Sequence, residues 1–527
     1  MLQIGQLLIN NAKNHADRMA LITPERKLTY KELNAESNCI ANALKRAGIQ
    51  REDRVAFLLK NSAEWVISWF ACQKIGAVCV PLHVRQRAEE LVECIDTAGC
   101  NTIIYHDKYE EKATYVMCAC MSLQTKICVG DKQQEDVIKW ETLYDAADYS
   151  EAQADISNDD PCVLLFTSGT TGLPKGVLRS QEMVALHAIT LAVRNKSPQN
   201  VDVMLSTAPL YHIGGLQAML KMLLLGGTFV SFNSIDAEKI LKTIAECGVT
   251  QLQMLPPITY ERLYNKYKEL NVDLSSVWEV CISAGKCTIE YTDHIFEMFP
   301  NSHLRPSWGS TETCSVTCMQ MTKDQLHQNS RLIKAVGTIM PFNQIKIVDE
   351  NGNEVAPGQA GEALVKSPMV FDGYVHDGAA PIHESVFNSD GWYKTGDVLR
   401  EDPETGYYYF LDRIKDIIKT GGESVYALEI ERAIEKHPAV LECAAIGIPD
   451  VRFGEAVGVA IVLNQGCSLS GEDLEKHSAA NLAGYKKPRH MAILDSMPIC
   501  STGKASKAEL KEKYLNKFKP IKSDDSH

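Results

Sequence analysis

The chain has 527 residues, of which 45% are hydrophobic and 23% are charged, and its formal net charge is −13. The length predicts a large domain with at least one smaller domain, and the composition excludes a largely disordered chain. The acidic balance argues against a nucleic-acid partner bound through a broad basic surface.

The N-terminal part alternates strand-like and helix-like stretches. Residues 1–19 lack the features of a signal peptide and are typical of an amphipathic first helix. A helix-like stretch at 32–48 is followed by three short apolar runs, the pattern of βα units around a mostly parallel sheet; these runs are 54–59, 77–82 and 101–106. The apolar stretch 65–82 contains Lys74, so we expect buried core and no integral membrane segment.

Seventeen cysteines occur without a CxxC pair or a zinc-type spacing with histidine. A long chain with many unpaired thiols is more typical of a reducing compartment than of a secreted disulfide framework. We therefore expect a cytoplasmic location and cysteines that are mostly small buried hydrophobic residues.

The later part of the chain changes character twice. Polar residues 150–161 predict a surface linker before the short apolar strand 162–167. Residues 361–375 and 406–419 show the shorter alternation of a smaller, more antiparallel sheet. Beyond Asp412 we expect a compact domain. Its apolar residues have helical spacing at 423–440, and it also contains strands at 439–450 and 455–464 and a helix at 472–484. The predicted domains are 1–412 and 413–518, with a polar tail at 519–527.

A loop rich in glycine and hydroxyl groups, TSGTTGLPKGV, directly follows the apolar strand. Glycines allow main-chain N–H groups to turn towards an anion, the hydroxyls add donors, and a lysine supplies a point charge. The loop is not a Walker A motif, because Pro174 stands where that motif needs glycine. It predicts a polyphosphate-binding cradle made by Thr167, Ser168, Gly169, Thr170, Thr171, Gly172 and Lys175.

TSGTTGLPKG closely resembles the signature of the acyl-adenylate-forming superfamily, and further motifs follow in that family's order from about residue 28 to about residue 510. The resemblance implies an α/β fold: a large N-terminal domain of packed mixed sheets, a small β-barrel-like subdomain and a small mobile α+β C-terminal domain. It also implies ATP, Mg²⁺ and coenzyme A as cofactors, and a small-molecule carboxylic acid as substrate.

WGSTE resembles the family's second signature. The resemblance assigns adenine stacking to Trp308 next to Gly309, a phosphate contact to Thr311, and magnesium to Glu312, roles that suit an indole face, a hydroxyl and a hard carboxylate. Most relatives have tyrosine where this chain has Trp308, which puts a hydrogen bond from that position in doubt. SAGK resembles the other wall of the adenine pocket, with Gly285 and Lys286.

The C-terminal motifs carry further expected contacts. YKTGD resembles the ribose-binding motif, whose carboxylate here is Asp397. LDRIKDIIKTGG resembles the domain junction, which places Arg413 on the ribose, Lys415 at a hinge, and Lys419, Gly421 and Gly422 on the loop of the thioester step. Lys504 matches the lysine that reaches into the active site during adenylation. A charged helix face or an exposed basic tail is the alternative interpretation of these lysines.

PLYHIGGL resembles the segment that borders the acyl pocket, with His212 as a group that takes part in both half-reactions. A satisfied core histidine is the alternative. Gly214 and Gly215 leave room for an acyl chain or ring.

Together these motifs predict an ATP-dependent acyl-CoA synthetase, an acid–thiol ligase that forms an acyl-adenylate and then a thioester. A stand-alone adenylation enzyme that loads a carrier-protein thiol, or a nucleotide sensor without turnover, is the alternative. The identity of the acid (fatty, branched, aromatic or carnitine-like) and the choice between monomer and homodimer stay open.

Overall fold

A computed structural model describes residues 2–132, 134–152, 154–167, 174–194, 201–254, 258–283, 287–375, 386–421, 423–499 and 505–521. The chain divides into two compact units. The first contains Met1–Gln344 with Val365–Tyr393, and the second contains Ile345–Leu364 with Lys394–His527. This division groups the smaller sheet with the C-terminal residues, and the boundary at 412/413 stays a prediction.

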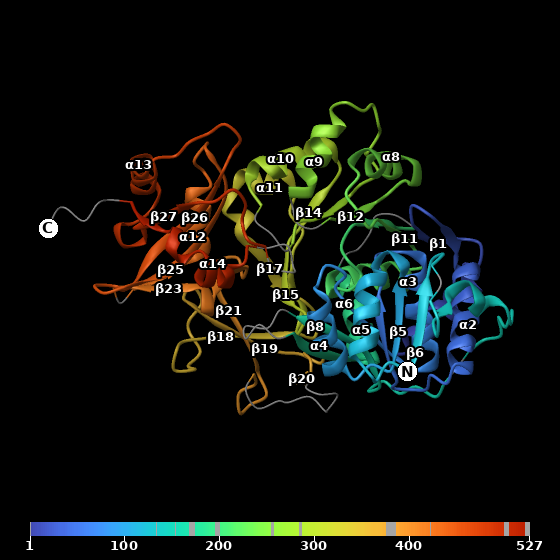
Figure 1. Ribbon diagram of the computed structural model, residues 1–527. Helices are drawn as coiled ribbons and strands as arrows, with labels where there is room; N and C mark the ends of the chain where they lie inside the picture. The colour runs from blue at the N-terminus through green and yellow to red at the C-terminus, as the bar shows by residue number, and fades with distance from the viewer. Residues whose placement is uncertain are drawn as a thin grey trace. The chain divides into compact units, whose positions relative to one another are not determined.

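An eight-stranded sheet forms one half of the first unit, with strand order β20-β9-β8-β4-β3-β5-β6-β7 (Figure 1). Strands β3 to β8 pair in parallel, whereas β9 is antiparallel to both β8 and β20. The parallel core confirms the strands expected at 54–59, 77–82 and 101–106. The bounds are β3 Arg54–Leu58, β4 Val78–Pro81, β5 Thr102–His106, β6 Thr125–Val129, β7 Ile138–Lys139, β8 Pro161–Thr167, β9 Lys175–Ser180 and β20 Tyr374–Val375.

Helices cover this sheet, and their ends follow local sequence signals. Thr29 caps the second helix with Glu32 in a reciprocal capping box. The third helix is mostly apolar and is buried on all sides, with Trp65 stacked on Trp69 at a ring-centroid distance of 5.7 Å. The bounds are α2 Tyr30–Arg46, α3 Ala63–Ile75, α4 Ala88–Ala98 and α5 Glu110–Ala119.

The polar segment 150–161 differs from the surface linker that the sequence predicted. Its Ala152, Ile156 and Asp160 are buried. Glu151 forms an ion pair with the buried ammonium of Lys74 in α3. Because a buried ammonium needs a partner, this segment is part of the packing of α3 and not a free connection.

A second, seven-stranded sheet has the order β14-β13-β12-β10-β11-β1-β2, and all of its pairs except β1–β2 are parallel. Carboxyl ends of parallel strands meet at one edge, so the ends of β10, β12, β13 and β14 lie at the same edge of the sheet. The strands are β1 Met19–Ile22, β2 Lys27–Thr29, β10 Val203–Ser206, β11 Thr228–Ser231, β12 Gln251–Gln253, β13 Glu279–Cys281 and β14 His303–Arg305. The helices of this half are α1 Ile4–Asn14, α6 Gln181–Arg194, α7 Ile213–Leu224, α8 Ala237–Cys247, α9 Ile258–Tyr267 and α10 Ile289–Met298.

Three further strands of the first unit follow β14 directly: β15 (Ser307–Ser310), β16 (Cys314–Cys318) and β17 (Ala335–Ile339), with α11 (Lys323–Gln328) between the last two. They pair antiparallel in sequence order. Residues Trp308, Gly309 and Ser310 of the WGSTE motif lie in β15, and Thr311 and Glu312 lie in the turn that follows it.

The second unit contains two groups of strands. The first has the order β22-β21-β19-β18. The described strands of this group form an open sheet, which corrects the expected β-barrel-like subdomain. The bounds are β18 Gln344–Val348, β19 Ala360–Lys366, β21 Tyr393–Glu401 and β22 Tyr408–Arg413.

The C-terminal strands form an α+β arrangement, as expected, around the long antiparallel pair β25–β26. One detail differs: residues 423–426, expected to begin a helix, form a strand paired with β23, and the helix begins at Ala427. The elements are β23 Ile417–Thr420, β24 Glu423–Tyr426, α12 Ala427–Ile434, β25 Val440–Asp450, β26 Gly454–Leu463, α13 Gly471–Asn481, β27 His490–Ile493, α14 Lys507–Lys513 and β28 Lys519–Pro520. Across the described ranges, every helix is too short or too polar to span a lipid bilayer.

Candidate functional site

The predicted phosphate loop joins two paired strands. Thr167 is the last residue of β8 and Lys175 the first of β9, and the two lie opposite each other in the antiparallel register. The hairpin therefore brings both ends of the loop together. The predicted phosphate ligands Ser168, Gly169, Thr170, Thr171 and Gly172 lie outside the described residues.

Lys175 lies near a carboxylate through a shared aromatic neighbour. Its Nζ is 4.8 Å from the ring centroid of Tyr374, and the Tyr374 hydroxyl donates a hydrogen bond of 2.8 Å to Oε1 of Glu312. A carboxylate has about four lone-pair positions, so Glu312 keeps acceptor capacity beyond this bond. An ammonium and a carboxylate so placed suit a phosphate and its counter-cation. Tyr374 was not predicted.

Arg179 holds the backbone of the same motif. Its side chain is fully buried, and Nη1 donates a hydrogen bond of 2.7 Å to the Thr311 carbonyl. Nη2 donates to the Met369 carbonyl, and the Phe371 amide donates to the Glu312 carbonyl at 2.9 Å. These contacts hold the Thr311–Glu312 backbone in place. Arg179 was not predicted, although a charged residue directly after the apolar pair Val177 and Leu178 was a usable signal.

Strand β15 contains Trp308 and requires glycine at the next position. Trp308 is buried in β15, and a Cβ on Gly309 would lie 1.7 Å from the Cys314 carbonyl oxygen. Ser283, the first residue of SAGK, is joined to β15 because its Oγ accepts a hydrogen bond of 3.1 Å from the Ser307 amide. The two predicted adenine-side segments are thus adjacent within the first unit. Gly285 and Lys286 lie outside the described residues.

His212 precedes the first residue of α7 and lies among aromatic rings. Its ring centroid is 4.8 Å from that of Tyr211 and 5.5 Å from that of His83. Burial, with a smaller contribution from His83, lowers the pKa of His212 to about 4. The imidazole is therefore neutral near pH 7 and can accept a proton or a hydrogen bond.

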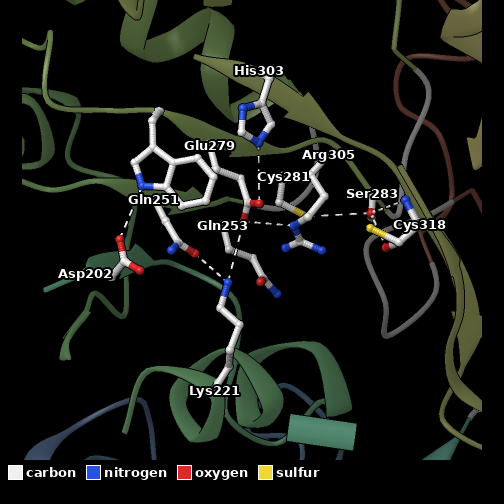
Figure 2. A network of polar contacts seen from close by, with 12 residues as sticks. Asp202, Lys221, Gln251, Gln253, Glu279, Cys281, Ser283, His303, Arg305 and Cys318 are labelled. Atoms are coloured by element: carbon white, nitrogen blue, oxygen red, sulfur yellow. Dashed lines mark hydrogen bonds and ion pairs between the residues drawn. The ribbon is translucent and has the colours of Figure 1, made fainter. Parts of the chain in front are cut away.

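A network of buried charged groups, drawn in Figure 2, lies within the second sheet. Glu279 on β13 lies 3.0 Å from Nε of Arg305 on β14 and 3.6 Å from Nζ of Lys221 on α7. Burial opposes ionisation, but Lys221 and Arg305 hold the pKa of Glu279 well below its usual range. This network joins α7 to β13 and β14, the strands that precede Ser283 and Trp308 in the chain. The network was not predicted from the sequence.

The expected ribose contacts lie together in the second unit. Asp397 on β21 and Arg413 on β22 are register partners, and Nε of Arg413 lies 3.1 Å from Oδ1 of Asp397. Asp397 is buried, whereas the Arg413 side chain is about half exposed. Lys175 and Trp308 belong to the first unit, so the convergence of all four residues on one nucleotide stays a prediction.

The expected hinge and thioester-loop residues follow β22. Lys415 lies in the single 3-10 turn Ile414–Asp416. Lys419 forms an exposed ion pair of 2.8 Å with Glu350. Gly421 has a φ of +61°, which glycine adopts without strain. The predicted residues Gly422 and Lys504 lie outside the described residues.

Comparison with known proteins places these features in a family. Residues 8–375 match the model described as AMP-binding enzyme, and residues 429–504 match the AMP-binding enzyme C-terminal domain. The chain is 29% identical to the putative acyl-CoA synthetase YngI of Bacillus subtilis, over 98% of this chain and 97% of that protein. It is also 29% identical to the fatty acid–[acyl-carrier-protein] ligase ScoC of Streptomyces coeruleorubidus, over 97% of this chain and 96% of that one.

A solved structure covers nearly the whole chain. It is the o-succinylbenzoate CoA synthetase MenE from Bacillus subtilis in complex with the acyl-adenylate intermediate OSB-AMP. The TM-score is 0.83 at 27% sequence identity, and the match covers 96% of this chain and 97% of that chain.

Proposed function

The chain belongs to the AMP-binding enzyme family and is an acid–thiol ligase, and we propose that it is an ATP-dependent acyl-CoA synthetase. It activates a carboxylic acid to acyl-AMP with release of pyrophosphate, and then forms acyl-CoA and AMP. The observation that carries this proposal is the arrangement of Lys175, Tyr374 and Glu312, which unites two separate sequence motifs at one place.

In the adenylation step a carboxylate oxygen of the acid attacks the α-phosphorus of ATP, and the bond to the pyrophosphate oxygen breaks. Negative charge builds on the phosphate oxygens, and preorganised donors stabilise it. Lys175 and the Thr311 hydroxyl supply such donors from the first unit. Lys504 is proposed to contact the same phosphate and the acid.

The residues present fit a magnesium ion that is shared with the nucleotide. The described residues contain no group of three or more histidine, cysteine, aspartate or glutamate side chains that could hold a metal alone. Mg²⁺ in nucleotide sites commonly takes one or two carboxylates and completes its shell with phosphate oxygens and water. Glu312 would hold it, and the bound ion would neutralise charge on the phosphates.

In the nucleotide site we propose that Trp308 stacks on adenine beside Gly309, Gly285 and Lys286. Asp397 accepts from the ribose hydroxyls and Arg413 donates to the ribose. The close pairing of Asp397 with Arg413 supports this role, because it places an acceptor and a donor side by side for the ribose hydroxyls.

In the thioester step the sulfur of coenzyme A attacks the acyl carbon and AMP leaves. Lys419, Gly421 and Gly422 are proposed to line the path of coenzyme A after rotation about Lys415. A neutral His212 at the acyl side can accept a hydrogen bond during this exchange.

The test measures the two half-reactions separately. Pyrophosphate release with ATP, magnesium and a panel of acids reports adenylation, and thioester formation from supplied acyl-adenylate reports the second step. Lys504→Ala is expected to abolish the first and leave the second largely intact. Equal loss of both would contradict a lysine that acts only in adenylation.

A second function is loading of a carrier-protein thiol, which is favoured by the likeness to ScoC, named as an acyl-carrier-protein ligase. Mass analysis of products with coenzyme A and with a phosphopantetheinylated carrier distinguishes the two acceptors. Transfer to the carrier alone would replace the first proposal by the second.

A further inference from the structure

The C-terminal helix α14 begins three residues after Lys504, and Lys507 is its first residue. Just before the helix, the Ser506 amide donates a hydrogen bond of 2.7 Å to the Pro498 carbonyl. This bond joins the two ends of the short segment of chain that contains Lys504. Any contact that fixes the start of α14 therefore also fixes one end of that segment.

Lys507 makes an ion pair that is largely withdrawn from solvent. Its Nζ lies 2.9 Å from Oε1 of Glu431 on α12, and the two side chains are 18% and 6% exposed. The same Oε1 accepts a hydrogen bond of 3.0 Å from the Ala445 amide of β25. One carboxylate therefore ties the start of α14 both to α12 and to the long strand pair β25–β26.

A second buried carboxylate lies in β22, one residue before the proposed ribose ligand Arg413. It belongs to Asp412, which is 4% exposed. One of its oxygens accepts a hydrogen bond of 2.8 Å from the Arg413 amide, and the other accepts one of 3.0 Å from the Leu428 amide at the start of α12. This carboxylate therefore connects the end of β22 to the helix that carries Glu431.

The surrounding carboxylates keep Lys507 protonated. Burial opposes the charge on its ammonium, but three neighbouring carboxylates raise its pKa above the usual value; they are those of Glu431, Asp412 and Asp416. Breaking a buried ion pair leaves an uncompensated charge, so the pair resists separation. Lys507 thus joins the segment that follows Lys504 to the strand that ends at Arg413.

We propose that Lys507 is a positioning residue for adenylation, which holds the segment of Lys504 in place through its ion pair with Glu431. This inference rests on the proposed function, since it requires Lys504 to contact the phosphate and the acid. A displacement of about 1 Å in a reacting group can cost about 100-fold in rate. Loss of the ion pair therefore slows adenylation without removing any group that contacts a substrate.

The experiment compares the two half-reactions on one enzyme preparation, with the best acid of the panel. Lys507→Met removes the charge, and pyrophosphate release is expected to fall by about 10- to 100-fold, while thioester formation from supplied acyl-adenylate stays within about twofold of wild type. The ratio of the two rates cancels differences in the amount of folded enzyme, so a purely structural defect leaves it unchanged. Lys507→Arg keeps the charge and is expected to bring the ratio back to within about threefold of wild type.

Lys513→Met is the matched control, because Lys513 lies on the same helix in an exposed ion pair of 3.2 Å with Glu509. It should change neither half-reaction. Lys507→Met also takes the ammonium away from the buried Glu431 carboxylate, which destabilises the fold. If that variant does not fold, the double variant Lys507→Met/Glu431→Gln, which removes both charges, is measured instead and should show the same fall in the ratio.

Two results would overturn the proposal. One is an unchanged ratio in the Lys507→Met variant, whether or not both rates fall, and the other is a ratio in Lys507→Arg as low as in Lys507→Met. Loss of adenylation in Lys504→Ala together with an unchanged ratio in Lys507→Met would overturn this inference alone. Failure of the proposed function is distinguishable, because then the wild type would release no pyrophosphate with any acid of the panel.

Discussion

Glu312 and Lys419 are both charged side chains with proposed roles in the reaction, but their surroundings differ. Glu312 is 8% exposed; its carboxylate accepts from Tyr374, and its backbone carbonyl accepts from the Phe371 amide. The Lys419 side chain is 62% exposed and pairs with Glu350, which is 86% exposed. A buried, multiply bonded group holds one geometry, whereas an exposed pair exchanges partners at little cost. The buried Glu312 suits a site that holds a nucleotide in one position. The exposed Lys419 suits a loop that binds coenzyme A only in the second step.

The largest expected effect is at the buried group. Glu312→Gln keeps an acceptor for Tyr374 but removes the charge, and we expect kcat/KM for ATP to fall by about 100- to 1,000-fold. Steady-state pyrophosphate release measures it. Tyr374→Phe is the control: it removes one hydrogen bond and keeps the carboxylate, so a loss of about tenfold is expected. Wild-type activity in the Glu312→Gln variant would contradict a role for Glu312 in the adenylation site.

Arg179 tests whether the buried arrangement depends on its support. Arg179→Met leaves the carbonyls of Thr311 and Met369 without their donor, and we expect the free energy of unfolding to fall by about 3 kcal/mol, together with a loss of kcat. Urea unfolding measures the first effect. Arg194→Met removes a less buried arginine that contacts Thr338 and should cost under about 1 kcal/mol. Equal losses of unfolding free energy in the two variants would show that the burial of Arg179 does not increase its contribution to stability.

His212, which is also buried, is expected to make the free energy of unfolding depend on pH. Its folded-state pKa of about 4 lies below the unfolded value near 6.5, so the unfolded state binds more protons between these values. Stability from this group is therefore complete above pH 6.5 and is lost as the pH falls towards 4, by about 3 kcal/mol. Unfolding free energies of wild type and His212→Gln across this range should converge at low pH. A constant difference would contradict the depressed pKa.

The smallest expected effect on stability is at the exposed pair. Lys419→Met is expected to change the free energy of unfolding by less than about 0.5 kcal/mol, because exposed ion pairs contribute little. Pyrophosphate release should be unchanged, while coenzyme A-dependent thioester formation should slow. Glu350→Gln, which removes only the partner, should alter neither reaction. Loss of adenylation in the Lys419→Met variant would contradict the proposal that Lys419 acts only in thioester formation.

Much of the architecture followed from neighbouring residues. The strands at 54–59, 77–82 and 101–106 were predicted from short apolar runs, and the capping pair Thr29 and Glu32 starts α2 where the helical pattern begins. The start of α12 was misjudged, because residues 423–426 pair with β23 and a strand partner overrides helical spacing. An anchored segment at 150–161 also escaped prediction, since its partner Lys74 lies 77 residues from Glu151.

The amino-acid sequence alone determined the motif order, the residue types of the phosphate loop and the α/β class, because these depend on short-range periodicity and on the chemistry of single side chains. Only the tertiary structure decided which distant groups meet: Arg179 with Thr311, 132 residues apart, Tyr374 with Glu312, 62 apart, and Glu279 with both Lys221 and Arg305. Such pairs depend on the order in which strands lie in a sheet and on which helix face is buried. Those choices are made by the packing of the whole core, and no local pattern contains them.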